Sequence, residues 1–288
     1  MSQRLALGTV QFGLEYGIAN KSGRVLPGSA AAILSEAAAH GIDILDTAIS
    51  YGDSERVLGA VGVVDWKVVS KMPAVPDECT DIANWVRDQI KGSLTRLRVS
   101  RLYGLLLHRP DQLLGPHGRS LLNALEDIKN QGLAQKIGVS IYAPEDLALL
   151  SDVMQLDLVQ APLNILDRRL VDSGWARRLK QQGTELHIRS VFLQGLLLMH
   201  TSHRPAEFSR WQPLWSVWDK WLNHTGQTPL QACLRYGLSI DDVDRVVVGV
   251  DSADQLREIL VAAQGSLDSV PAWPEPLDAD LINPARWH

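Results

Sequence analysis

Short apolar runs rich in β-branched residues alternate along the chain with longer segments whose apolar residues recur at helical spacing. Eight of these runs have the length and composition of buried parallel strands. They cover residues 5–10, 42–48, 67–72, 102–108, 136–142, 156–163, 185–192 and 245–250. Because parallel strands need a crossover between them, the alternation predicts repeated βα units.

Helical patterns fill the gaps between the predicted strands, most clearly over residues 29–41, 80–97, 120–132 and 252–263. Eight βα units close naturally into a barrel, so we predict an α/β protein with a (β/α)8 fold and one domain over residues 1–288. An open doubly wound sheet is the alternative. Such a sheet would carry a glycine-rich phosphate turn after its first strand, and neither GxGxxG nor GxxxxGK[ST] occurs.

Two segments depart from this alternation. Residues 195–227 form a long connection with four tryptophans at a spacing that places them on one helix face. These are Trp211, Trp215, Trp218 and Trp221. We favour a helix docked on the barrel wall, with an aromatic wall for a substrate as the alternative. From about residue 265 the chain is rich in Pro and Trp, and we expect irregular chain laid over the surface.

Charge and composition exclude several classes of partner. The net charge is −5 with both signs interspersed, so no broad positive field exists for nucleic acid or an anionic membrane. The two cysteines, Cys79 and Cys233, form no CxxC pair and suggest neither a disulfide framework nor a zinc site. No stretch resembles a signal peptide or a membrane span, so we expect a soluble cytoplasmic protein. Nothing in the sequence indicates an oligomeric state.

Candidate chemistry gathers at the ends of three consecutive predicted strands. Asp46, Lys71 and His108 each end such a strand, and Tyr51 follows Asp46 in the adjoining loop. In a parallel barrel the carboxyl ends of the strands meet at one mouth, where active sites lie. Each residue alone has a structural explanation, as a turn former, a surface lysine, a loop histidine or a ring on the rim. Their joint occurrence on successive strands favours a common site.

The set is suited to protonating a carbonyl oxygen as negative charge develops on it. A lysine ammonium beside a phenol stabilises the phenolate, so Tyr51 would release its proton more readily. Asp46 would keep Lys71 charged and in place, and a neutral His108 could orient the carbonyl. No amino-acid side chain supplies a hydride, so a reduction at this site requires an external donor.

At this point the sequence resembles the aldo-keto reductase family. The most diagnostic motif is GIDILDTAISYGDSERVLG at 41–59. Four more motifs occur along the chain in the family's order. They are GTVQFG at 8–13, before this motif, and SKMP at 70–73, LLLHRP at 105–110 and GVS at 138–140 after it. The resemblance implies that Tyr51 is the general acid, that Lys71 and Asp46 tune it, and that His108 positions the carbonyl.

The resemblance also implies a nicotinamide cofactor, with uneven support. Thr9, Ser140 and Gln160 match positions that border the nicotinamide and its ribose, whereas Ile141 replaces the usual asparagine. Arg189 stands where the family often places an aromatic residue beneath the nicotinamide. Its guanidinium either stacks on that ring, which is unfavourable for the positively charged oxidised form, or turns aside to a cofactor phosphate.

For the adenosine end, residues 249–259 resemble the family's phosphate loop and last helix. Ser252 precedes free amides suited to an anion, and Gln255 and Glu258 match positions near the adenosine. No Lys or Arg stands at the usual 2′-phosphate sites, and Asp251 would repel that phosphate. We expect NADP(H) rather than NAD(H) from family habit, with NAD(H) left open.

The sequence therefore predicts an NAD(P)H-dependent reductase of a small-molecule aldehyde or ketone, with sugar-derived carbonyls among the candidates. The departures at Ile141, Arg189 and Ile259 motivate an alternative, a non-catalytic nicotinamide-binding sensor or assembly subunit on the same fold. A third hypothesis is an aldolase that uses Lys71 as a Schiff base, which the 41–59 motif makes remote. The physiological substrate cannot be derived from any short motif.

Overall fold

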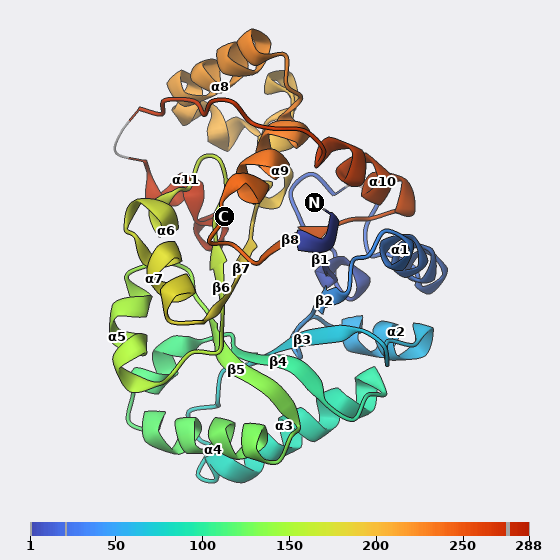
Figure 1. Cartoon of the computed structure of the whole chain (residues 1–288), viewed down its shortest axis with the longest axis vertical. Coiled ribbons are helices and arrows are strands. Elements are labelled where there is room, and N and C mark those ends of the chain that lie inside the picture. Colours follow the sequence, from blue (N-terminus) through green and yellow to red (C-terminus); the bar gives the residue numbers. More distant parts are fainter. Residues whose placement is uncertain (1, 21, 275–276, 288) are drawn as a thin grey trace.

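The computed structural model describes residues 2–20, 22–274 and 277–287, and its centre is a closed barrel of eight parallel strands (Figure 1). The strands are β1 (Leu5–Gly8), β2 (Ile44–Asp46), β3 (Lys67–Met72), β4 (Leu102–Leu107), β5 (Ala134–Ser140), β6 (Leu158–Pro162), β7 (Glu185–Arg189) and β8 (Arg245–Gly249). Each strand pairs with the next in sequence, and β8 pairs with β1 from Leu5↔Val246 to Gly8↔Gly249. The predicted (β/α)8 barrel is confirmed.

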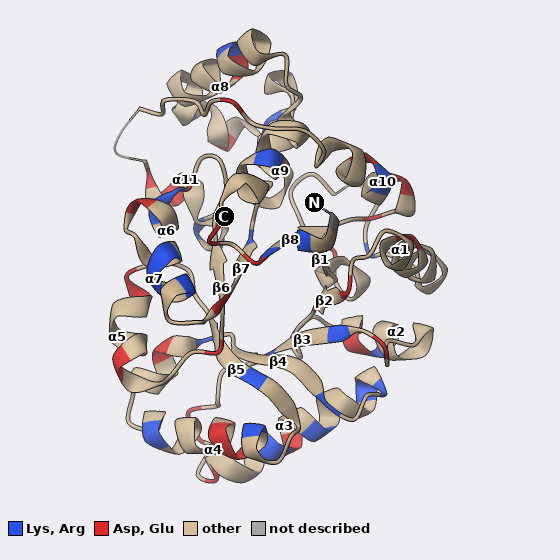
Figure 2. Cartoon of the chain, viewed as in Figure 1, with Lys and Arg blue, Asp and Glu red and all other residues tan. Residues whose placement is uncertain are grey.

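The helices surround the barrel, and their sequence positions follow the predicted alternation (Figure 1). They are α1 (Pro27–Ala39), α2 (Ser54–Val61), α3 (Ile82–Leu97), α4 (Gly118–Asn130), α5 (Asp146–Val153), α6 (Arg169–Asp172), α7 (Trp175–Gln181), α8 (Gln212–Thr225), α9 (Pro229–Ser239), α10 (Ala253–Ala262) and α11 (Ala279–Ile282). Lys, Arg, Asp and Glu are interspersed over these outer helices (Figure 2). Among the described residues, no helix has the length and apolarity needed to cross a membrane.

Alternate strand positions belong to two apolar clusters, as the two-residue period of a strand requires. In β1, Leu5 and Leu7 pack in the large cluster that includes the helices, whereas Ala6 belongs to a small inner cluster. The other members of the inner cluster are Ile44, Val69, Leu106, Leu158 and Val247. They come from five further strands, so this cluster is a thin apolar layer across the barrel interior.

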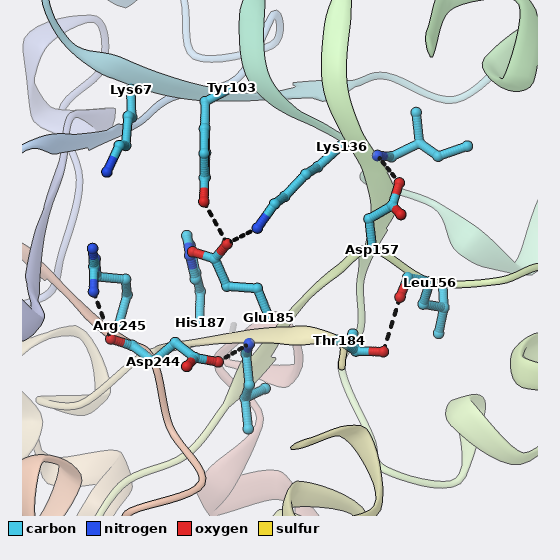
Figure 3. A network of polar contacts seen from close by, with 12 residues as sticks. Lys67, Tyr103, Lys136, Leu156, Asp157, Thr184, Glu185, His187, Asp244 and Arg245 are labelled. Carbon is cyan, nitrogen blue, oxygen red and sulfur yellow. Dashed lines mark hydrogen bonds and ion pairs between the residues drawn. The ribbon is translucent and has the colours of Figure 1, made fainter. Parts of the chain in front are cut away.

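Below that layer, at the amino ends of the strands, a polar network fills the barrel (Figure 3). Glu185, the first residue of β7, accepts hydrogen bonds from Tyr103 (2.6 Å) and His187 (2.7 Å) and forms an ion pair with Lys136. Asp43 pairs with the first residues of two strands, Lys67 at 2.7 Å and Arg245 at 3.6 Å. Each of these lysines and the arginine thus has a carboxylate partner within the protein.

The tryptophan-rich connection forms three short 3-10 turns and helix α8, which lies outside the main ring of helices (Figure 1). Trp215 and Trp218 are fully buried, and the ring of Trp221 stacks on Trp218 at 5.6 Å. Trp273 from the C-terminal segment lies 5.9 Å from Trp218. The stripe therefore serves packing, and none of its tryptophans lines the cavity described below.

The C-terminal segment combines irregular chain with α11 and a 3-10 turn, η7 (Pro284–Arg286). Leu281 and Ile282 of α11 are buried, and Arg210 pairs with Asp280 at 3.1 Å. This anchoring brings Pro284 to the rim of the cavity at the carboxyl ends of the strands.

Candidate active site

A cavity of about 600 Å³ opens at the carboxyl ends of the strands, the size and place expected for a small-molecule site in a barrel. Seven of the predicted site residues line it, namely Thr9, Asp46, Tyr51, His108, Arg189, Gln255 and Glu258. Lys71, Ser140, Gln160 and Ser252 lie outside that lining. Three of these four, Lys71, Ser140 and Gln160, are buried on strands β3, β5 and β6.

Lys71 and Asp46 form a buried ion pair beneath the cavity. The Lys71 ammonium donates to both Asp46 carboxylate oxygens at 2.8 Å and to the carbonyl of Thr47 at 3.0 Å. Burial alone would lower the pKa of Lys71, but the attraction of Asp46 outweighs it and raises that pKa above its ordinary value. The ammonium is therefore charged and has its hydrogen atoms directed by fixed acceptors.

Tyr51 is placed by a tight approach of two loops. A side chain on Gly13 would put its Cβ 1.8 Å from the Tyr51 carbonyl oxygen, so only glycine fits there. Gly52 has a φ of +53°, which L residues rarely adopt, and a Cβ there would meet the Gly13 carbonyl at 2.6 Å. The loop geometry thus explains the glycines of both motifs, and it leaves the Tyr51 ring centroid 5.1 Å from the Lys71 ammonium.

His108 packs edge-on against Tyr51, with ring centroids 5.9 Å apart and an interplanar angle of 76°. Its Nδ1 lies 3.3 Å from the Ser50 hydroxyl. Burial, together with the nearby charges of Lys71 and Arg189, lowers the pKa of His108 to about 4. His108 is therefore a neutral imidazole at ordinary pH, and one that can donate or accept a hydrogen bond.

Thr9 contributes mainly to the framework that holds Asp46. Its hydroxyl donates to the Asp46 carbonyl at 2.9 Å and lies 2.9 Å from the Ser54 hydroxyl, which is itself 3.0 Å from that of Thr47. All three hydroxyl residues are completely buried. This network ties the ends of β1 and β2 to the start of α2.

Four buried polar atoms at the site have no hydrogen-bond partner among the described residues, on Ser140, Gln160, Gln11 and Asp251. Gln160 donates from Nε2 to Asp46 at 2.6 Å, but its Oε1 has no partner among the described residues. The buried hydroxyl of Ser140, on the paired position of β5, likewise has none. Buried polar groups are normally hydrogen-bonded, so two neighbouring ones without partners mark a place for a polar ligand. A carboxamide would supply the missing donors.

Arg189 ends β7 and faces the cavity beside the predicted catalytic residues. It donates to the carbonyl of Ile141 at 2.9 Å and to the Ser190 hydroxyl at 3.2 Å. The guanidinium carbon lies 4.8 Å from the centroid of the Tyr142 ring. Arg189 thus has neutral partners only among the described residues.

On the β8–α10 side of the cavity, Ser252 caps helix α10 by accepting from the Gln255 amide at 3.2 Å. The Gln255 side chain in turn accepts from the Asp251 amide at 2.8 Å. Burial raises the pKa of Asp251, against the effect of the Gln255 hydrogen bond. Glu258 completes this side, so two carboxylates face the cavity here.

Comparison with known proteins identifies the family to which the chain belongs. The family described as "Aldo/keto reductase family" matches residues 4–270. The chain belongs to the aldo/keto reductase family. Members of this family are oxidoreductases that act on small-molecule carbonyl compounds with nicotinamide cofactors.

Relatives of this aldo/keto reductase are distant. A 6-dehydroglucose reductase from Novosphingobium aromaticivorans is 30% identical over 142 residues, which are 43% of this chain and 45% of that protein. The chain thus matches less than half the length of this curated relative. A solved aldo-keto reductase from Bacillus halodurans has a TM-score of 0.69, with 20% identity over 93% of this chain and 88% of that one. For the glycerol dehydrogenase from Gluconobacter oxydans, the TM-score is 0.70, with 22% identity over 92% and 87%.

Sequence reasoning missed several residues of the cavity wall in this family member. Tyr16 and Asn20 come from the loop after β1, Tyr142 from the loop after β5, and Gln194 from the connection after β7. Gln194 has a φ of +53°, an unusual conformation that no local motif signals. A search for aromatic residues after each strand end would have found Tyr142, which follows Ser140 by two positions.

Proposed function

We propose that this protein reduces an aldehyde or ketone to an alcohol with NAD(P)H, and that Tyr51 is the general acid. The observation that carries the proposal is the buried Lys71–Asp46 pair beneath a phenol that opens into a cavity. A structural lysine would not need full burial, two carboxylate bonds and a tyrosine ring 5.1 Å away. Desolvating such a pair is costly, which favours a functional reason for it.

The proton transfer follows from the charges around Tyr51. As the carbonyl oxygen gains negative charge, Tyr51 passes its phenolic proton to that oxygen, and the O–H bond of the phenol breaks. The phenolate that remains is stabilised by the Lys71 ammonium, whose own charge Asp46 maintains. Neutral His108 donates a hydrogen bond to the same carbonyl and fixes its direction. The reduced nicotinamide, when bound, supplies the hydride to the carbonyl carbon.

The unpaired oxygens of Ser140 and Gln160 fit the nicotinamide carboxamide. We propose that these two residues and Thr9 border the nicotinamide, with Arg189 as a further wall, and that Ser252, Gln255 and Glu258 lie at the adenosine. The family resemblance favours NADP(H) over NAD(H). Asp251 and Glu258 oppose a 2′-phosphate by charge. A binding titration with NADPH and NADH measures the cofactor preference, and tighter binding of NADH would contradict a preference for NADP(H).

Sugar-derived carbonyls belong in the substrate panel because the partial relative carries the name 6-dehydroglucose reductase. The alternative function is a nicotinamide-binding sensor or assembly subunit without turnover, favoured by the replacement at Ile141 and Ile259. Reduced cofactor binding with no oxidation across a panel of aldehydes, ketones and sugars would support that alternative.

The decisive experiment replaces Tyr51 by Phe. We expect kcat to fall by about 10²–10⁴-fold, the usual contribution of a general acid, while the Kd of the reduced cofactor stays within about twofold. Tyr103→Phe is the matched control, because it removes the same hydroxyl at the opposite end of the barrel. Reduction that persists in Tyr51→Phe, or a wild-type protein that binds neither NADPH nor NADH at millimolar concentration, would refute the proposal.

A further inference from the structure

Arg189 is a half-buried cation that has no anionic partner among the described residues. Its hydrogen bonds go to one backbone carbonyl and one hydroxyl, which use two of the five guanidinium hydrogens. Arg4, another half-buried arginine, donates to three carbonyl oxygens. Arg96 and Arg169, also half-buried, each meet a carboxylate at 2.8 Å. Arg168 and Arg235 likewise have only neutral acceptors, but they lie outside the cavity lining, in which Arg189 is the only described lysine or arginine. Arg189 therefore keeps donors and a full charge that the described residues do not use.

The part of the cavity around Tyr51 carries one net positive charge. Asp46 is cancelled by Lys71, and His108 is neutral because its pKa is about 4. Burial raises the pKa of Tyr16, which also lines this part, so its phenol is neutral as well. Arg189 is the charge that remains. A single positive charge of this kind attracts an anion.

The two acidic residues on the β8–α10 side do not cancel Arg189. Arg189 acts on the pKa of His108, Lys71 and Tyr16, which places it beside the reacting end of the cavity. Asp251 is held on the α10 side, where its amide donates to Gln255, and neither Asp251 nor Glu258 forms an ion pair with Arg189. The cavity therefore has a positive side at the proton donor and a negative side at α10.

We propose that Arg189 binds a carboxylate of the substrate, so that the preferred substrates are aldehydes or ketones that also carry a carboxylate. This inference rests on the proposed reductase function and adds a substrate class to it. A guanidinium matches a carboxylate with two parallel hydrogen bonds. One carboxylate neutralises the single charge of this part of the cavity, whereas a phosphate monoester would leave excess negative charge beside Asp46.

The test compares acids with neutral partners of similar shape, namely succinic semialdehyde with butanal and glucuronate with glucose. In the wild-type enzyme we expect kcat/KM to be at least about tenfold higher for the acid of each pair. In Arg189→Met this ratio falls to near one, mainly through the KM of the acid. Arg189→Lys restores part of the ratio, because it returns the charge without the planar fork.

Arg109→Met is the matched control for charge removal. Arg109 follows His108 in the sequence but lies outside the cavity lining, bound to Asp111 at 3.0 Å. This variant should keep the wild-type ratio. In Arg189→Met the Kd of the reduced cofactor should rise less than the acid ratio falls, because Arg189 borders the nicotinamide but forms its ion pair with the substrate anion. A cofactor Kd that rises as much as the acid ratio falls would assign Arg189 to the cofactor and overturn the proposal.

The remaining outcomes separate this inference from the proposed function. Neutral carbonyls reduced as well as their acid partners by the wild-type enzyme would overturn the carboxylate site and leave the reductase intact. Reduction of no carbonyl at all would refute the reductase. In that case calorimetry with succinate still tests the anion site. Succinate binding that disappears in Arg189→Met supports the site, whereas a wild-type protein that does not bind succinate overturns it.

Discussion

The two ends of the barrel are both rich in charged residues, but they differ in whether those residues have partners of opposite charge. At the amino end, Lys136 and His187 meet Glu185, while Lys67 and Arg245 meet Asp43 (Figure 3). At the carboxyl end Lys71 meets Asp46 beneath the cavity, whereas Arg189, which faces the cavity, has no acidic partner among the described residues. The thin apolar layer of Ala6, Val69 and Leu158, with its neighbours, separates the two sets.

This difference supports the proposal that the carboxyl end takes the ligand. A charged cluster that closes on itself can stabilise the barrel without any other molecule. Unpaired buried oxygens on Ser140 and Gln160, together with the unmatched charge of Arg189, instead require a partner from outside. Buried polar atoms without a partner among the described residues occur at both ends, on Asp43, His187 and Arg245 as well as on Ser140 and Gln160. The cavity and the unmatched charge of Arg189 are what distinguish the carboxyl end.

The largest expected effect comes from removing the cation of the buried pair at the carboxyl end. Lys71→Met leaves Asp46 buried with Gln160 as its side-chain partner, so we expect the free energy of unfolding to fall by about 3–5 kcal/mol. Carbonyl reduction should also be lost. Urea denaturation measures the first effect, and the double variant Lys71→Met/Asp46→Leu should regain most of the stability without activity. A Lys71→Met protein as stable as the wild type would show that the pair is not desolvated as the structure indicates.

A smaller effect is expected at the amino end from Glu185→Gln. Burial would raise the pKa of Glu185, but hydrogen bonds from His187, Lys136 and Tyr103 outweigh it and hold that pKa well below its usual range. A carboxylate of this kind stabilises the fold above its unfolded pKa of about 4.3, and the gain disappears as pH falls through the folded pKa. We expect Glu185→Gln to lose about 2 kcal/mol at neutral pH and to keep its kinetic constants.

Denaturation curves at several pH values check this second prediction. The stability gap between wild type and Glu185→Gln should narrow as pH falls below about 4, because the unfolded wild-type chain then takes up a proton on Glu185 while the folded protein does not. A loss of kcat in Glu185→Gln at full folding would break the separation between the two ends. It would show that the apolar layer transmits the change to Asp46.

The smallest effect concerns His108 and sharpens the description of the carboxyl end. Its pKa of about 4 follows from burial and from the charges of Lys71 and Arg189. NMR titration of the His108 ring should therefore find a pKa that rises toward 6.5 in Arg189→Met and stays unchanged in Arg109→Met. A wild-type value near 6.5 would place the arginine charge away from the reacting groups and weaken the anion argument.

Much of this architecture could be predicted from the order of residues alone. The eight strands were recognisable because buried parallel strands are continuous apolar runs, and their ends differed from the structure by only a few residues. The convergence of Asp46, Lys71 and His108 also followed, because strand order in a closed barrel dictates which ends meet. The local sequence pattern was sufficient for these features because the closed barrel itself fixes where each strand end lies in space.

Other features were decided only by tertiary contacts. Tyr16, Tyr142 and Gln194 enter the cavity because loops after three different strands pack together, and no short motif encodes that packing. The sequence left Arg189 between a nicotinamide ring and a phosphate, and only its neutral partners exposed the unmatched charge. The sequence by itself determined the barrel and the strand ends at which the proposed proton donor lies, since both depend on periodicity and strand order. The folded structure decided which polar groups were left without partners, because the hydrogen-bond and ion-pair partners of a buried group come from residues distant in the sequence.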